Sequence, residues 1–165
     1  MALFMFRGTG AAYWLPEVAS DNGPTETELA AGFKFSRAFN NIQGLEPQQS
    51  PINVAVLEHK TELTIEGPET FNQVTITIVE DDGTGTSQDA LVQQEALDTF
   101  EDGEEGVLVL SRTKKDPEAG DDVYMIRGAF GRQTPQWGLD AAAAVTDCNL
   151  FPTSPLDKVK VLPAD

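Results

Sequence analysis

The residues with the greatest potential for catalysis are a single histidine, His59, and a single cysteine, Cys148. A Ser-His-Asp or Cys-His centre would depend entirely on His59, and the sequence contains no Gly-x-Ser-x-Gly nucleophile elbow. No motif surrounds Cys148, and one cysteine cannot form an intramolecular disulfide. We therefore expect no nucleophilic catalysis and interpret Cys148 as a small buried apolar residue.

Metal and phosphate sites are disfavoured by the spacing of the acidic and glycine-rich segments. The stretch EDDGTGTSQDAL (80–91) begins like a calcium loop, but Leu91 falls where a bidentate glutamate is required when Gly85 takes the glycine position. GTGAA (8–12) and GTGTS (83–87) lack the lysine of a phosphate-binding loop. Carboxylate pairs are frequent enough to arise by chance, so they do not indicate glycoside hydrolysis. We predict that the protein is not an enzyme and uses no cofactor or metal.

Negative charge is concentrated in the middle of the chain. The whole sequence has 11 basic and 27 acidic residues, a net charge of −16. Residues 61–122 hold 3 of the basic and 17 of the acidic residues, which gives −14 for that segment. Such a surface repels nucleic-acid phosphates and keeps a chain soluble before assembly. A well-solvated surface without further purpose is the alternative interpretation.

The elements that must position these residues are mainly β, with one α-helix. Val74, Ile76 and Ile78 alternate with Thr75 and Thr77, which is typical of a half-buried strand. The run Val107–Leu110 predicts a strand buried on both faces. Further strands are predicted at 33–39, 52–57, 61–65, 123–127 and around 145–150, although the alanine run 141–144 favours a helix.

One helix is predicted to begin at Ser87, which can cap it, and to end near Gly103. Residues 25–31 form either a short helix or a turn. Four carboxylates surround the end of the long helix, where the helix dipole disfavours anions: Glu101, Asp102, Glu104 and Glu105. They belong either to a solvated loop or to a rim or channel surface that has to be negative.

The domain boundaries are predicted from the Gly- and Pro-rich segments that separate the predicted elements. Residues 1–24 form an N-terminal arm that carries Tyr13, Trp14 and Leu15, and this aromatic segment must pack on its own domain or on a neighbour. Residues 25–151 form one domain, which includes a long loop at 40–51. Residues 152–165 form a C-terminal arm with Val159 and Val161. Arms and open strand edges suit a protein that associates with copies of itself.

The order of these elements resembles the major tail tube protein of long-tailed, siphovirus-like bacteriophages, particularly phages of actinobacteria. The resemblance runs from about Glu28 to Phe151 and includes QVTITIVEDD (73–82), SQDALVQQEALDTF (87–100), GVLVLSR (106–112) and DVYMIRG (122–128). It implies a β-sandwich or partly closed barrel with a flanking helix, extended terminal arms and a long loop.

The resemblance also implies a function in the virion, where hexameric rings stack into a tube through which the genome passes during ejection. The implied partners are copies of the chain itself and the tape measure, terminator and baseplate proteins of the tail, with assembly in the host cytoplasm. DNA would pass without specific binding, and no membrane is involved. The implied inter-ring contacts are Tyr13, Trp14, Leu15, Ile42, Leu45, Pro47, Val159 and Val161. The implied lumen or acidic surface comprises Thr75, Thr77, Asp81, Asp82, Glu101, Asp102, Glu104 and Glu105.

Two alternatives remain open at the level of sequence. A tail terminator or head–tail joining protein would also form rings but would not polymerise without limit. A β-sandwich binding module would recognise carbohydrate or a protein through loops 40–51 and 128–138, with Gln133, Gln136 and Trp137 as its contact surface.

Overall fold

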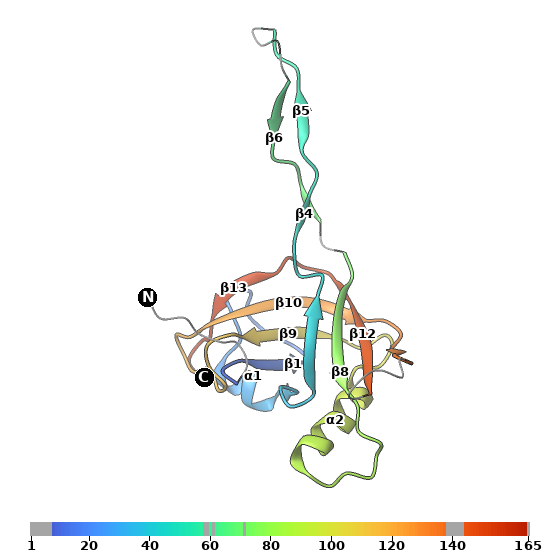
Figure 1. Cartoon of the computed structure of the whole chain (residues 1–165). Helices are drawn as coiled ribbons and strands as arrows, with labels where there is room; N and C mark the ends of the chain where they lie inside the picture. The colour runs from blue at the N-terminus through green and yellow to red at the C-terminus, as the bar shows by residue number, and fades with distance from the viewer. Residues whose placement is uncertain (1–7, 58–59, 61, 71, 138–143, 165) are drawn as a thin grey trace.

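The structure, a computed structural model, describes residues 8–57, 60, 62–70, 72–137 and 144–164. A curved antiparallel sheet forms the body, and a long hairpin projects from it (Figure 1). The helices are α1 (Glu26–Ala31) and α2 (Gln88–Thr99). The strands of the body are β1 (Ala11–Leu15), β2 (Phe33–Lys34), β3 (Phe39–Gln43), β8 (Val74–Val79), β9 (Glu105–Ser111), β10 (Asp122–Phe130), β11 (Thr134–Pro135), β12 (Val145–Pro152) and β13 (Asp157–Lys160). The strands of the hairpin are β4 (Gln48–Gln49), β5 (Ile52–Val54), β6 (Leu63–Ile65) and β7 (Glu69–Thr70).

The main sheet has the strand order β2-β1-β9-β10-β12-β8-β3. β13 pairs with the first half of β10 and β12 with its end, so the long strand β10 belongs to both halves of the folded sheet. In the described part of the chain the two edge strands, β2 and β3, do not pair with each other. The predicted β-rich sandwich with a flanking helix is confirmed, and the sheet remains open rather than closing into a barrel.

β9 is buried on both faces, as its apolar run predicts. Leu108 and Leu110 point into a cluster that contains Trp14, Phe100 and Phe130. Val107 and Val109 point the other way, into a cluster under α1 and β13. Two apolar layers on one strand explain why this segment contains no alternation of polar and apolar residues.

The predicted alternation of β8 is also confirmed. Val74, Ile76 and Ile78 are fully buried, whereas Thr75 and Thr77 are only half-buried on the opposite face. The predicted terminal strand exists as β12, which pairs with β8 along its length. Of the alanine run 141–144, residues 141–143 lie outside the described residues.

α2 begins as predicted, because the Ser87 hydroxyl accepts a hydrogen bond from the Ala90 amide at 3.2 Å. Its last carbonyls are satisfied from another part of the chain: the Gln133 Nε2 donates to the carbonyl oxygens of Leu97 (2.8 Å) and Phe100 (2.7 Å). Gly103 has the left-handed φ of +88° that favours glycine, in the turn after the helix. Residues 26–31 form a helix rather than a turn, because Thr25 and Glu28 form a capping box.

Two predictions about the segment from 33 to 51 are wrong. The predicted continuous strand 33–39 is interrupted: Phe33–Lys34 form β2 and Phe39 begins β3. Between them the chain turns at residues 35–38, where the amides of Ala38 and Phe39 donate to the Phe35 carbonyl. This turn places Phe35 and Ala38 together in the core, which a continuous strand could not do. The expected loop 40–51 is instead occupied by most of β3 and by β4, where the projecting hairpin begins.

The expected terminal arms also require correction. Residues 11–15 form β1, which pairs with β9 in the main sheet and is buried along its whole length. Residues 157–160 form β13, paired with β10, and Val161 is buried. Burial in the protein's own core removes these apolar side chains from water, so neither segment extends away as an arm.

Candidate assembly surfaces

The hairpin carries an apolar face that the described part of the chain does not cover. Ile52 lies opposite Ile65 and Val54 opposite Leu63, so these four side chains share one side of the two-stranded ribbon. Their exposed fractions are 46% for Ile52, 50% for Ile65, 37% for Val54 and 43% for Leu63. An isolated hairpin is marginally stable in water, so this exposed apolar face is suited to contact with another molecule.

The opposite side of the ribbon is polar. Asn53 lies opposite Thr64, and the Thr64 hydroxyl donates a hydrogen bond to the Asn53 Oδ1 at 3.1 Å. At the base of the hairpin the Gln49 Nε2 donates to Glu66 (2.7 Å) and Glu69 (2.8 Å). The ribbon is therefore amphipathic, with one polar side and one apolar side.

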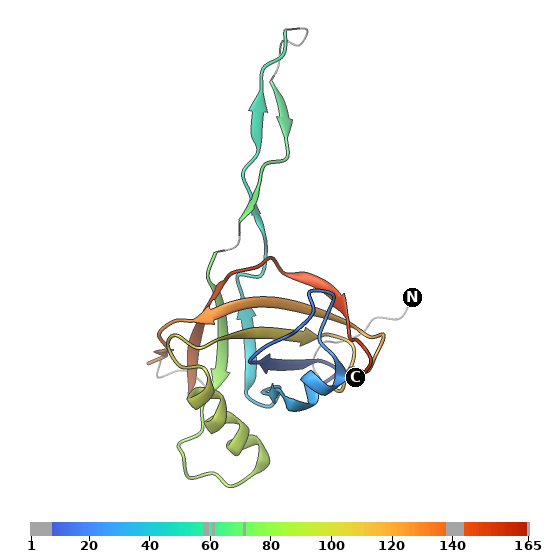
Figure 2. The ribbon, with the colours of Figure 1, turned by 180° about the vertical axis from the view of Figure 1, so that it is seen from behind.

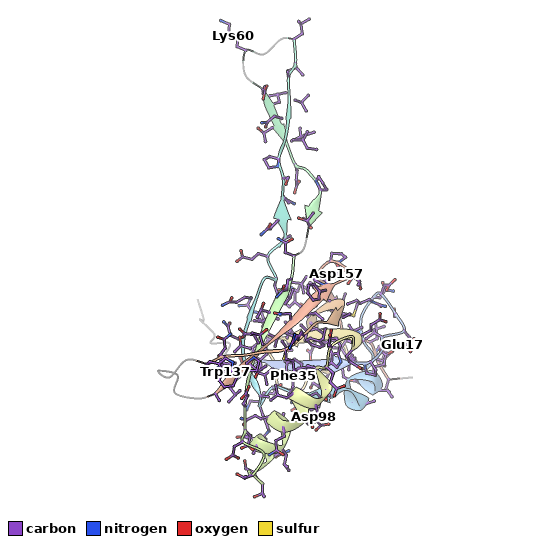
Figure 3. The ribbon with its side chains drawn as sticks, turned by 90° about the vertical axis from the view of Figure 1, so that its right-hand side faces the viewer. Glu17, Phe35, Lys60, Asp98, Trp137 and Asp157 are labelled. Atoms are coloured by element: carbon purple, nitrogen blue, oxygen red, sulfur yellow. The ribbon has the colours of Figure 1, made fainter. Side chains whose placement is uncertain are left out.

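The hairpin and α2 lie at opposite ends of the body. Figure 2 shows the hairpin extending away from the sheet on one side and α2 hanging below it on the other. Figure 3 labels Lys60 at the tip of the hairpin and Asp98 on α2 at the far end. β8 joins the two ends, because it follows the hairpin at Val74 and leads into the acidic segment after Val79.

A second surface is the polar outer face of β3, β8 and β12. One cross-strand row runs from Asn41 to Thr77 to Asp147, and the next from Gln43 to Thr75 to Asn149. The Thr77 hydroxyl donates to Asp147 at 2.8 Å and the Thr75 hydroxyl to Asn149 at 3.4 Å. In these two rows Asp147 is the one charged side chain, so the face is made mostly of amides and hydroxyls.

The carboxylates predicted to line a lumen are not on that face. Asp81 and Asp82 lie in the loop before α2, where they accept hydrogen bonds from the backbone amides of Gly83, Thr84 and Gly85. The Thr84 hydroxyl and amide lower the pKa of Asp82. The other four, at 101, 102, 104 and 105, are exposed in and just after the turn between α2 and β9. All six therefore lie at the α2 end of the body.

The predicted inter-ring residues are scattered by the fold. Tyr13, Trp14, Leu15 and Val161 are buried in the chain's own core, so their side chains have little surface to offer a neighbour. Val159, Ile42 and Leu45 are half-buried against the core clusters. Pro47 is exposed immediately before β4.

Sequence reasoning missed the hairpin as an exposed element. Ile52, Val54, Leu63 and Ile65 alternate with polar residues as a body strand does, so the pattern predicts strands without indicating that they leave the body. The available signal was the surrounding composition: residues 46–70 carry five glutamates and no Phe, Trp or Tyr. Core strands of this protein, by contrast, contribute Trp14 and Phe130 to an aromatic cluster.

Most of the residues predicted to form the contact surface of a binding module make hydrogen bonds within the chain instead. The Gln133 side chain donates a hydrogen bond to the Phe100 carbonyl at the end of α2, and the Gln136 side-chain amide donates to the Asp147 carboxylate. Trp137 alone of the three projects, with 88% of its surface exposed (Figure 3). Two of the three predicted contact residues are therefore committed to internal hydrogen bonds.

Neither a metal site nor a membrane-spanning helix is found among the described residues. No group of three or more His, Cys, Asp and Glu side chains there could hold a metal ion. No helix in the same part of the chain is long and apolar enough to cross a membrane. Cys148 is buried, as expected.

Comparison with known proteins places the fold and the family. The chain is similar to the sheath/tube terminator of PVC, an extracellular contractile injection system, in its extended state, with a TM-score of 0.60, 12% identity, and 96% of this chain and 98% of that chain covered. It is also similar to a chain of the PVC sheath–tube complex (TM-score 0.58, 13% identity, 97% and 93% covered) and to one of the anti-feeding prophage baseplate (TM-score 0.56, 12% identity, 98% and 99% covered). At these identities the likeness shows a shared fold.

No curated protein sequence matches the chain. A family model described as phage tail tube protein matches residues 1–165, the whole chain. The chain therefore belongs to the phage tail tube protein family, and it is a structural component of the virion tail rather than an enzyme.

Proposed function

We propose that this protein is the repeating subunit of the tail tube of a long-tailed, siphovirus-like phage of actinobacteria. Copies assemble in the host cytoplasm into hexameric rings that stack into a tube, together with tape measure, terminator and baseplate proteins. The observation that carries the proposal is the exposed apolar face of the projecting hairpin, Ile52, Val54, Leu63 and Ile65. A contact between copies would remove this face from water and stabilise a hairpin that is only marginally stable on its own.

The polar face of β3, β8 and β12 would line the lumen in this proposal. Its amides and hydroxyls, Asn41 and Thr77 among them, present no cations to DNA phosphates. The six carboxylates at the α2 end would then form a negative rim that recurs with every ring, rather than a continuous acidic wall. Such a lumen repels the genome weakly and repeatedly, so DNA slides through without binding.

A second candidate is a tail terminator ring, because the structural likeness includes the PVC sheath/tube terminator and the cap that ends the anti-feeding prophage tube. The fold alone does not separate the two functions, since both a sheath–tube chain and a terminator chain resemble this one. The hairpin favours the tube subunit, because its uncovered apolar face would be buried by continued stacking.

Negative-stain electron microscopy of the purified, concentrated protein tests the proposal. We expect hollow tubes of constant width from the wild type and unstacked rings or monomers from Ile65→Asp, which places a charge on the apolar face. Thr64→Asp is the matched control, because Thr64 is the adjacent residue on the polar side, and it should still form tubes. Single closed wild-type rings would favour the terminator, and normal tubes from Ile65→Asp would remove the hairpin from the stacking contact.

A further inference from the structure

An apolar groove lies beside the root of the hairpin. It has a volume of about 330 Å³, and its apolar walls are Phe39, Ile42, Leu45, Leu110, Tyr124 and Leu156. The first three residues belong to β3 and to the segment between β3 and β4, whereas Leu110 and Tyr124 belong to β9 and β10. The groove therefore lies at the open edge of the sheet, between β3 on one side and β9 and β10 on the other.

The groove exists because the sheet stays open. β3 is an edge strand that pairs with β8, and the described part of the chain places no strand on its other side. Five of the lining residues pack against the main core cluster but remain half-buried: Phe39, Ile42, Leu45, Tyr124 and Leu156. Their remaining apolar surface faces the groove and is available for burial.

We propose that this groove receives the apolar face of the hairpin from a second copy of the chain. The proposal rests on the stacked assembly proposed above and names the surface on which the hairpin docks. The chain's own hairpin extends away from the body, as Figures 1 and 2 both show, and contributes no residue to the lining of the groove. A neighbouring copy presents the same hairpin from outside.

The two surfaces match in chemistry. The hairpin offers four aliphatic side chains in two opposed pairs, Ile52 with Ile65 and Val54 with Leu63. The groove offers aliphatic and aromatic walls with one cationic side chain, that of Arg112. Contact between them covers exposed apolar surface on both partners at once, which the hydrophobic effect favours.

The two surfaces also match in charge. Leu110, Tyr124 and Lys158 lie in one cross-strand row, so the Lys158 side chain is on the groove side of the sheet. Lys158 and Lys160 both form ion pairs with the carboxylate of Asp122, at 3.5 and 3.2 Å, which leaves this trio with a net positive charge. The hairpin is negative: residues 46–70 contain five glutamates and one lysine. Complementary charge sets the orientation of such a contact.

Disulfide trapping tests the docking directly. The wild type has one cysteine, the buried Cys148, so introduced thiols can be paired without a competing exposed one. Ile65→Cys and Leu156→Cys are made in separate chains, mixed, assembled and oxidised, so that only contact between copies gives a mixed dimer on a non-reducing gel. In the matched control, Thr64→Cys takes the place of Ile65→Cys. The side chain at position 64 points to the polar side of the hairpin, away from the side chain at position 65.

We expect a mixed disulfide from Ile65→Cys with Leu156→Cys in assembled tubes and roughly tenfold less from the Thr64→Cys control, whose thiol faces away from the groove. Normal tubes without that disulfide would overturn the groove assignment and leave the tube function intact. A wild type that forms only closed rings would instead remove the tube function, and with it the stacked contact proposed here. If Leu156→Cys fails to assemble, Leu45→Cys with Val54→Cys repeats the test on the same two surfaces.

A second measurement identifies what covers the groove. A benzophenone attached to the introduced thiol of the Leu156→Cys variant is irradiated in assembled tubes, and the cross-linked peptides are mapped by mass spectrometry. Cross-links to residues 52–65 of another copy support the proposal. Cross-links confined to any other segment overturn it, as does an introduced thiol that reacts with maleimide as fast in tubes as in monomers.

Discussion

Trp14 and Phe100 pack edge to face in the centre of the core, with ring centroids 6.0 Å apart and planes at 82°. Trp14 comes from β1 near the start of the chain, and Phe100 caps the end of α2. Phe130 packs against both rings, with centroids 4.6 Å from each. The start of the chain, the long helix and β10 are therefore joined through one aromatic cluster.

Deleting residues 2–16 should unfold the protein rather than merely prevent stacking. The deletion removes β1, which pairs with β9 over five residues and fills both apolar layers. Replacing residues 47–70 by a short Gly-Ser turn should leave the body folded, because the described hairpin residues belong to neither core cluster. Thermal unfolding followed by circular dichroism measures both, and a cooperative transition in the 2–16 deletion would contradict this assignment of β1.

Phe100→Ala should destabilise the protein by about 3–5 kcal/mol, because it removes a fully buried ring and leaves a cavity among other aromatic side chains. Phe151→Ala is the matched control, since that ring is half exposed, and its cost should be about 1 kcal/mol or less. Urea unfolding at constant m-value gives both numbers. Equal costs would show that Phe100 is not central to the core.

Stability should fall at alkaline pH because of Cys148. Burial, with smaller contributions from Asp147 and Glu80, raises the pKa of this thiol from 9.0 to about 12. The folded state therefore keeps the proton that the unfolded chain begins to lose near its ordinary pKa of 9.0, so the stabilisation is complete below that pH and is lost as the pH rises toward 12. Burial raises the pKa of Tyr13 in the same direction.

Melting temperatures measured across the alkaline range, from neutral pH upward, check this dependence. Cys148→Ala should start from a lower melting temperature but lose less of it over that range, because the titrating thiol is gone. The thiol of the native protein should also resist alkylation in mildly alkaline buffer and react only after unfolding. Rapid alkylation under native conditions would contradict the burial of Cys148.

Reversing Glu101, Asp102, Glu104 and Glu105 to Lys should make assembled tubes retain DNA if these residues form a rim of the lumen. The substitutions replace four carboxylates per subunit by four cations. Each cation that contacts a DNA phosphate strengthens DNA binding by the tube, and high salt weakens this effect. The corresponding Gln variants are the graded control and should retain little DNA. Retention is measured by nuclease protection at low and high salt, and no retention by the Lys variant would place the four residues on the outside of the tube.

Local sequence was sufficient to predict several elements of this fold. The alternation of β8, the two-sided burial of β9 and the Ser87 cap of α2 follow from neighbouring residues, because strand period, apolar run length and capping act within a few positions. The same sequence disfavoured an active site, since its one histidine and one cysteine have no motif around them. The negative segment 61–122 was likewise visible from composition alone.

Only the tertiary structure decided which apolar segments are buried and which are free. Tyr13-Trp14-Leu15 has the composition of an arm, but Trp14 pairs with Leu108 far along the chain, a contact that local sequence does not encode. Ile52 and Ile65 have the alternation of core strands, yet their strands pair with each other beyond the body and leave them half exposed. An apolar pattern predicts that a side chain will be buried. Long-range strand pairing determines whether it is buried in the core of its own chain or against the surface of a neighbour.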